Sequence, residues 1–266
     1  MSWLALYCKE LRLTRTKFLF NIVFLMMVAV LFFFLIDRYS AFFITLTVPL
    51  ILVHLFYMFF AMLDSLRQEW KHKTSVFWLN IPTSGWQLLS AKFAAAMTQL
   101  LASLLATFLI IYYLLKHSAT IFSDPTIPYL LIEQYEQFWW IFFIGIFIAS
   151  LQSGVVATFI YMMAKSVRKL GWLLGIVISF ASGWLWFKFQ QTFIYKSLTE
   201  WGVVLHEAEL MESFYFHFDS LGSEPSLDME IANDVILYVG TSIVDLILVV
   251  VVLYISAWLL DHKVEA

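Results

Sequence analysis

The segment Asp64–Lys92 reads DSLRQEWKHKTSVFWLNIPTSGWQLLSAK and separates two long apolar runs, Ala41–Leu63 and Phe93–Leu115. It carries four Lys or Arg residues and a break at Asn80–Gly85, where Asn, Pro, Ser and Gly occur close together. Irregular backbone is excluded from lipid-facing hydrocarbon because its unpaired N–H and C=O groups are costly there. We therefore expect Asp64–Lys92 to be a structured loop outside the bilayer, and its positive charge favours the cytoplasmic side.

The composition indicates an integral membrane protein. Hydrophobic residues make up 62% of the 266 residues and charged residues only 13%, whereas a soluble domain usually carries about 25% charged residues. Cys8 is the single cysteine, so no disulfide can form within the chain, which suits a reducing cytoplasm. The first apolar run is too long for a signal peptide and lacks a small-residue cleavage site, so we expect no cleaved leader.

Six apolar runs are long enough to span a membrane, which takes about 20 residues each. An even number of spans puts both termini on one side. That side would hold 12 of the 16 Lys and Arg residues, which predicts that it is the cytoplasm. We expect one all-α transmembrane domain over residues 1–266, in the bacterial plasma membrane, with six helices at Phe18–Ile36, Ala41–Leu63, Phe93–Leu115, Phe138–Ala164, Leu170–Phe187 and Ile236–Leu260.

Residues 1–17 are amphipathic at helical spacing. One face carries Trp3, Leu4, Tyr7 and Leu11, and the cations Lys9, Arg12 and Arg15 lie around the other side. This pattern predicts an interfacial helix whose cations meet anionic headgroups, worth about 1 kcal/mol per cation near the surface. The alternative is a basic flank that only sets the orientation of the first span.

The expected external loop, residues 189–235, carries nine Asp or Glu residues. Within it, apolar residues recur at helical spacing, which predicts an amphipathic helix. The helix would either lie at the outer membrane interface or pack on the outer ends of the spans. The residues concerned are Trp201, Val204, Leu205, Ala208, Met211 and Tyr215.

Small residues form ridges at four-residue spacing in the fourth and fifth spans. The fifth span carries Gly171, Gly175, Ser179 and Gly183. Such ridges let helix backbones approach closely in lipid. They predict helix packing, and both packing within one subunit and pairing with a second subunit remain open.

One acidic residue, Asp245, and one histidine, His54, lie within the expected spans. Asp245 follows Thr241 and Ser242 by one turn, and a charged Asp at mid-membrane costs about 2.5–3.5 kcal/mol on insertion scales. We therefore expect Asp245 to face protein or a wet cavity. His54 can remain neutral as a hydrogen-bonded core residue. One acid and one histidine would make a sparse proton relay.

Motifs for catalysis are missing from the sequence. The P-loop pattern G-x-x-x-x-G-K-[ST] does not occur, and the only His-Glu pair, His206-Glu207, is not followed by the second histidine of a zinc-protease helix. His206, Glu207, Glu209, His217 and Asp219 match no metal motif and are better explained as a solvated acidic face. We expect no enzymatic activity, no bound cofactor or metal, and no nucleic-acid partner for this chain.

Two short motifs and the expected topology resemble the permease subunit of type-2 ATP-binding-cassette transporters. Cys8-Lys9-Glu10-Leu11-Arg12 is similar to the N-terminal Lys-Glu-Leu-Arg region of the family. The run from Leu79 through Pro82 to Lys92 is similar to its LL-x-x-P-x-S…GK loop, with Ala91 in place of the usual glycine, and Glu69 takes the place of the acidic residue ahead of that loop.

The resemblance implies a set of partners. Two permease subunits, identical or homologous, would form the membrane unit, and two separate ATPase subunits carrying ATP and Mg would dock beneath it. The coupling element would lie within residues 64–92 and include Glu69, Trp70, Leu79 and Pro82. The transporter would be an exporter, of amphipathic compounds such as antimicrobial peptides or lipids. Two alternatives stay open: a proton-coupled carrier that uses Asp245, and a membrane subunit that senses or confers immunity without transport.

Overall fold

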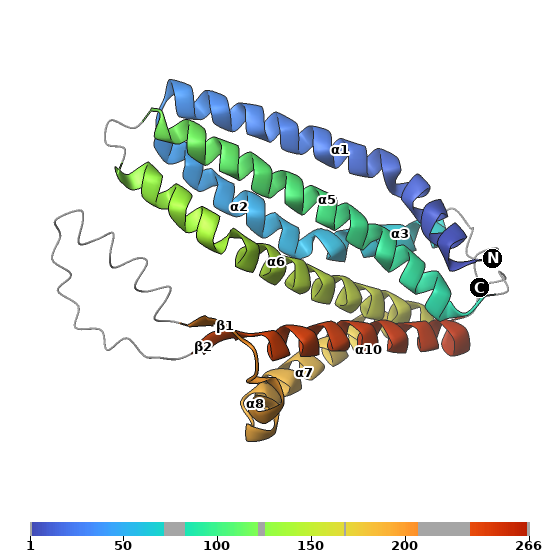
Figure 1. The fold of residues 1–266 in the computed structure, drawn as a ribbon. Helices are drawn as coiled ribbons and strands as arrows, with labels where there is room; N and C mark the ends of the chain where they lie inside the picture. Colours follow the sequence, from blue (N-terminus) through green and yellow to red (C-terminus); the bar gives the residue numbers. More distant parts are fainter. Residues whose placement is uncertain (1, 72–82, 122–125, 168, 207–234, 265–266) are drawn as a thin grey trace. The chain divides into compact units, whose positions relative to one another are not determined.

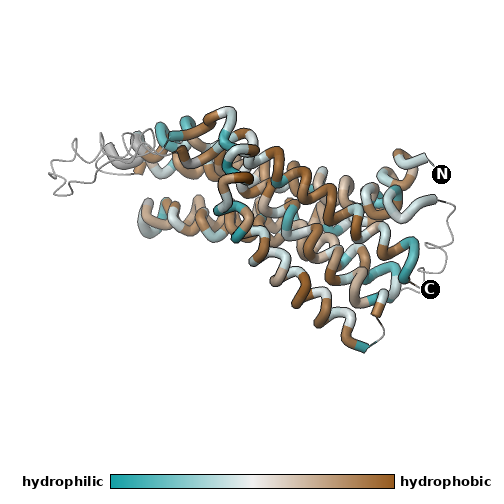
Figure 2. The backbone as a smooth tube through the Cα atoms, turned by 90° about the horizontal axis from the view of Figure 1, so that it is seen from below, coloured by the Kyte–Doolittle hydropathy of each residue, from teal (hydrophilic) through white to brown (hydrophobic). Residues whose placement is uncertain are grey.

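The computed structural model describes residues 2–71, 83–121, 126–167, 169–206 and 235–264. In this part of the chain, six helices are long and apolar enough to cross a membrane, which confirms the predicted number. Most of their length is hydrophobic in Figure 2. Contacts divide the chain into a first unit, residues 1–180 with 248–266, and a second unit, residues 181–247.

Each of the six spans ends a few residues beyond the end of its predicted apolar run. The helical and strand elements are α1 (Trp3–Arg38), η1 (Ala41–Leu46), α2 (Thr47–Leu52), η2 (Val53–Phe56), α3 (Tyr57–Lys71), α5 (Gly85–Ala119), α6 (Thr126–Ser166), α7 (Gly171–Gln190), α8 (Phe193–Thr199), β1 (Val203–His206), β2 (Val235–Tyr238) and α10 (Val239–Lys263).

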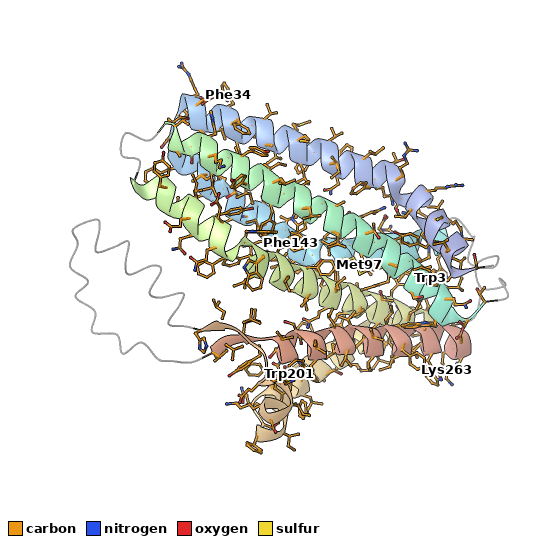
Figure 3. The ribbon with its side chains drawn as sticks, in the orientation of Figure 1. Trp3, Phe34, Met97, Phe143, Trp201 and Lys263 are labelled. Carbon is orange, nitrogen blue, oxygen red and sulfur yellow. The ribbon has the colours of Figure 1, made fainter. Side chains whose placement is uncertain are left out.

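In the first unit, α1 packs along α5, and α3 packs on α6 and on α5 (Figure 1). The main core lies among α3, α5, α6 and the later part of α10, and its fully buried members include Met58, Met62, Leu89 and Leu100. In Figure 3, side chains project from these helices both toward neighbouring helices and away from them.

The second span is not a regular α-helix. Two 3₁₀ segments, η1 and η2, flank the short helix α2. Pro49 lies in α2 and has no N–H, so the α-helical hydrogen bond from residue 49 to the carbonyl of Thr45 cannot form. A change of helix type at this point is the expected response.

Both ends of the segment Asp64–Lys92 are helical rather than loop. Asp64 to Lys71 is the end of α3, and Gly85 to Lys92 is the start of α5. Ser84 caps α5 by accepting from the Gln87 N–H, and the Gly85 N–H donates to Asp261 Oδ1 at 2.7 Å. A Cβ on Gly85 would lie 2.9 Å from the Ala257 carbonyl, so this close approach of α10 requires glycine.

Residues 3–17 continue into the first span without interruption, as one helix of 36 residues. The structure shows no boundary between the expected interfacial helix and the first span, and an interfacial position of residues 3–17 stays a prediction. The cytoplasmic location of the termini also stays a prediction. The start of α1 lies against the start of α5, where Trp3 Nε1 donates to Ser90 Oγ at 2.9 Å (Figure 3).

The second unit corrects the prediction of an amphipathic helix that begins at Trp201. Val203–His206 forms strand β1, which pairs antiparallel with β2. Gly202 lies between α8 and β1 with φ of 66°, a conformation that a non-glycine residue rarely adopts. The last span therefore begins at Val239 and not at Ile236. The later part of the predicted helix lies outside the described residues.

Candidate functional site

The most unusual feature of the first unit is a buried cluster of three charged side chains. Lys92 Nζ on α5 donates to Glu10 Oε2 on α1 and to Glu69 Oε1 on α3, each at 2.8 Å. The side chains are only 1%, 5% and 9% exposed. Ser65 Oγ accepts a further hydrogen bond from the ammonium at 3.3 Å. We call Glu10, Glu69 and Lys92 the ionic triad.

The triad ties three helices together at one end of the first unit. Each charge, taken out of water, would cost several kcal/mol, and mutual attraction with good hydrogen-bond geometry offsets this cost. Moving any of the three helix ends away from the others would expose or unpair a buried charge. The end of α3 and the start of α5, which flank residues 72–84, are therefore mechanically joined to α1.

A line of polar residues continues from the triad along one face of α5. Gln99 Nε2 donates to Thr14 Oγ1 at 2.5 Å, and Asn21 Nδ2 donates to Ser103 Oγ at 2.8 Å. Lys92, Gln99 and Ser103 are seven and four residues apart, which places them on the same face. This face joins α5 to α1 by hydrogen bonds within an otherwise apolar region.

His54 lies at the far end of this polar line and is buried. Its Nδ1 lies 3.0 Å from the Leu50 carbonyl, so Nδ1 carries a proton, because a carbonyl can only accept. Its Nε2 lies 3.1 Å from Ser103 Oγ and 3.3 Å from Thr107 Oγ1. A neutral ring accepts from Ser103 at Nε2, and the Thr107 hydroxyl donates to the Ser103 carbonyl at 3.0 Å, in agreement with the interpretation of His54 as a hydrogen-bonded core residue.

The residues predicted to contact an ATPase have different outcomes. Glu69 belongs to the triad, and Trp70 packs edge-on against Tyr161 with Lys165 Nζ 5.1 Å from its ring centroid. Trp70 is thus engaged with α6 of its own chain. Leu79 and Pro82 lie outside the described residues, so their role stays a prediction.

The ridge of small residues on α7 is used for packing within the chain at its start. A Cβ on Gly171 would lie 2.2 Å from the Met163 carbonyl, and one on Gly175 would lie 3.0 Å from Ile160 Cα. Ser179 donates to the Gly175 carbonyl at 2.8 Å. A Cβ on Gly183 would meet no heavy atom of the described residues within 4 Å. Gly171 and Gly175 therefore favour packing on α6, and pairing with a second subunit stays a prediction.

Asp245 lies in α10 and is partly buried. It belongs to the second unit, whereas His54 belongs to the first. In the described ranges, no three His, Cys, Asp or Glu side chains gather in a way that could hold a metal ion.

Glu10 and Lys92 lie within the family-like motifs, but the sequence alone does not identify them as site residues. The feature that could have identified them is their charge, because the helical period places both residues among apolar neighbours. The pairing itself joins residues 82 apart, which no local pattern reveals.

No protein-family model matches the chain, and no curated protein and no solved structure is detectably similar to it.

Proposed function

We propose that this chain is the membrane-spanning permease subunit of an ATP-driven exporter and that it is driven by separate ATPase subunits. The observation that carries the proposal is the ionic triad. It joins the charged residues of the motifs that suggested the resemblance: Glu10 of the N-terminal run, Glu69 ahead of the expected coupling element, and Lys92 at its end.

The triad is suited to transmit movement. A force applied to residues 72–84 from below the membrane would act on the end of α3 and the start of α5 together. Because Lys92 also holds Glu10, α1 would follow. Packed helices change between discrete arrangements rather than deforming continuously, so such a movement acts on whole spans. ATP and Mg would bind the partner subunits, and a second permease subunit would complete the translocation path.

Purification of the tagged full chain from its native bacterial membrane tests this function. We expect an ATPase with Walker motifs to copurify, and its ATP hydrolysis in lipid vesicles to depend on the chain. The variant Lys92→Met should reduce both, whereas Lys116→Met, which removes an exposed lysine near the other end of the same helix, should reduce neither. Absence of any such ATPase, or hydrolysis indifferent to the chain, would refute the proposal.

A second candidate is a proton-coupled carrier. It is favoured by the buried network of His54, Ser103 and Thr107, which contains a titratable ring. The two candidates differ in their energy source. Transport by the ATP-driven permease should survive an uncoupler while ATP is held constant, and transport by the carrier should stop.

A further inference from the structure

A cavity of about 520 Å³ lies within the first unit between α1 and the η2–α3 segment, and α5 forms its floor. Ligand-binding pockets typically measure about 300–1,000 Å³. Each wall is formed by residues on one face of a helical segment. One wall consists of residues of α1 between Glu10 and Asn21, and the opposite wall consists of residues of η2 and α3 between Val53 and Ser65. From Glu10 to Asn21 an α-helix makes eleven steps of about 1.5 Å and rises about 16 Å, close to half of the ~30 Å hydrocarbon thickness. The cavity therefore has the length of one leaflet.

The cavity is charged at one end. Lys17 of α1 and Asp64 of α3 form an ion pair across it, and both side chains are about half exposed, at 52% and 50%. Gln68 Nε2 donates to Asp64 Oδ2 at 2.9 Å. An ammonium offers three donors and a carboxylate about four acceptor sites, so each partner keeps capacity for a further ligand.

The other end of the cavity is aromatic and open to the side. Along the η2–α3 wall, Phe60 lies one turn and Phe56 two turns from Asp64, and these rings expose 65% and 57% of their surface, while Tyr57 beside them is half-buried. The floor is lined by Ala95 and Ala96, whose small side chains create the space. Exposed aromatic rings beside a half-exposed ion pair form an amphipathic surface that matches a headgroup followed by an acyl chain.

We propose that this cavity binds one membrane lipid with a zwitterionic phosphate–ammonium headgroup. The lipid phosphate pairs with Lys17, the lipid ammonium pairs with Asp64, and one acyl chain lies against Phe56 and Phe60. The proposal concerns binding by this chain alone and does not depend on an ATPase partner.

Charge complementarity selects a zwitterionic headgroup over an anionic one. The cavity is lined by two cations, Lys17 and Lys92, and by two anions, Glu10 and Asp64. Lys92 is already held by Glu10 and Glu69. An anionic lipid would find only Lys17, with the Asp64 carboxylate beside it, and like charges brought together without water repel. An ammonium beside the phosphate removes this repulsion.

Lipid titration of the purified full chain, followed by native mass spectrometry, tests the proposal. The probes are phosphatidylethanolamine and phosphatidylglycerol with identical acyl chains. We expect one phosphatidylethanolamine per chain, bound at least about tenfold more tightly than phosphatidylglycerol. Asp64→Asn and Lys17→Gln should each weaken phosphatidylethanolamine by about tenfold, the effect of losing one charge-assisted hydrogen bond.

Two matched control positions lie on α1 outside the cavity. Asp37→Asn and Lys9→Gln remove exposed or half-exposed charges from α1 and should leave lipid affinity unchanged. Ala61→Phe, on the cavity wall, should fill the space and abolish the tightly bound lipid while the chain still melts as a folded protein.

Equal affinity for the two lipids would overturn the proposal, because it would indicate the annular lipid that surrounds any span. Unchanged binding in Asp64→Asn or Lys17→Gln would also overturn it, as would a folded Ala61→Phe variant that retains the lipid. None of these results bears on the copurification of an ATPase, so the two proposals fail separately.

Discussion

Removal of the Lys92 ammonium is the most direct test of the ionic triad. In Lys92→Met, Glu10 and Glu69, which are 5% and 9% exposed in the unchanged chain, lose the cation between them. Breaking a buried ion pair by removing one partner typically costs about 3–5 kcal/mol, because a buried charge is left uncompensated. We expect a loss of that size in the free energy of unfolding. Lys17→Met breaks a half-exposed pair and should cost less than about 1 kcal/mol.

The assay is reversible unfolding in mixed micelles with increasing dodecyl sulfate, followed by fluorescence of the 11 Trp residues. A triple variant, Glu10→Met, Glu69→Met and Lys92→Met, separates charge from packing. Replacing a buried ionic cluster with apolar residues is often neutral or stabilising, so the triple variant should recover most of the loss. If Lys92→Met costs no more than Lys17→Met, or if the triple variant is no better than the single one, buried charge does not hold these helices together.

Three further predictions use other positions. Gly175→Leu should lower the free energy of unfolding by about 1–3 kcal/mol because α6 leaves no room for a side chain. Its control, Gly183→Leu, should change the free energy of unfolding by less than about 0.5 kcal/mol. Equal effects of the two variants in the same micelle assay would contradict the packing of α7 on α6. Gly240→Ala places a Cβ 2.3 Å from the Thr199 carbonyl oxygen and should lower the melting temperature. Gly145→Ala, where the new Cβ would meet no heavy atom of the described residues within 4 Å, should leave the melting temperature unchanged. Thermal unfolding followed by circular dichroism measures both. Asp245→Asn should retain most transport in vesicles supplied with ATP, and complete loss would favour the proton-coupled carrier.

The membrane spans could be predicted from sequence because their signal is local. An uninterrupted apolar run longer than a bilayer leaves few alternatives to a helix. The ends of the helices could not be predicted in the same way. The polar composition of Asp64 to Lys71 and of Gly85 to Lys92 predicts a loop, yet the first segment is the end of α3 and the second is the start of α5. Their helical state depends on tertiary contacts, such as the Asp261 carboxylate that accepts from the Gly85 N–H.

The prediction of an amphipathic helix at Trp201 failed for a related reason. The residues Trp201, Val204 and Leu205 fit a helical period, but over so few residues the period does not exclude a strand. Gly202 with its positive φ and the β-branched pair Val203-Val204 favour a turn and a strand, and pairing with Val235–Tyr238 decides between them. That partner lies some thirty residues later in the chain.

The 3₁₀ segments of the second span have a consequence for the axial alignment of charges. A 3₁₀-helix rises about 2.0 Å per residue and an α-helix about 1.5 Å. The six residues of η1 and four of η2 therefore reach about 5 Å further than the same residues would as α-helix, which is close to one helical turn. If the span were regular, Asp64 and Glu69 would stand about one turn short of Lys17 and Lys92. The irregular backbone around Pro49 thus acts as a spacer that brings opposite charges on three helices to the same level.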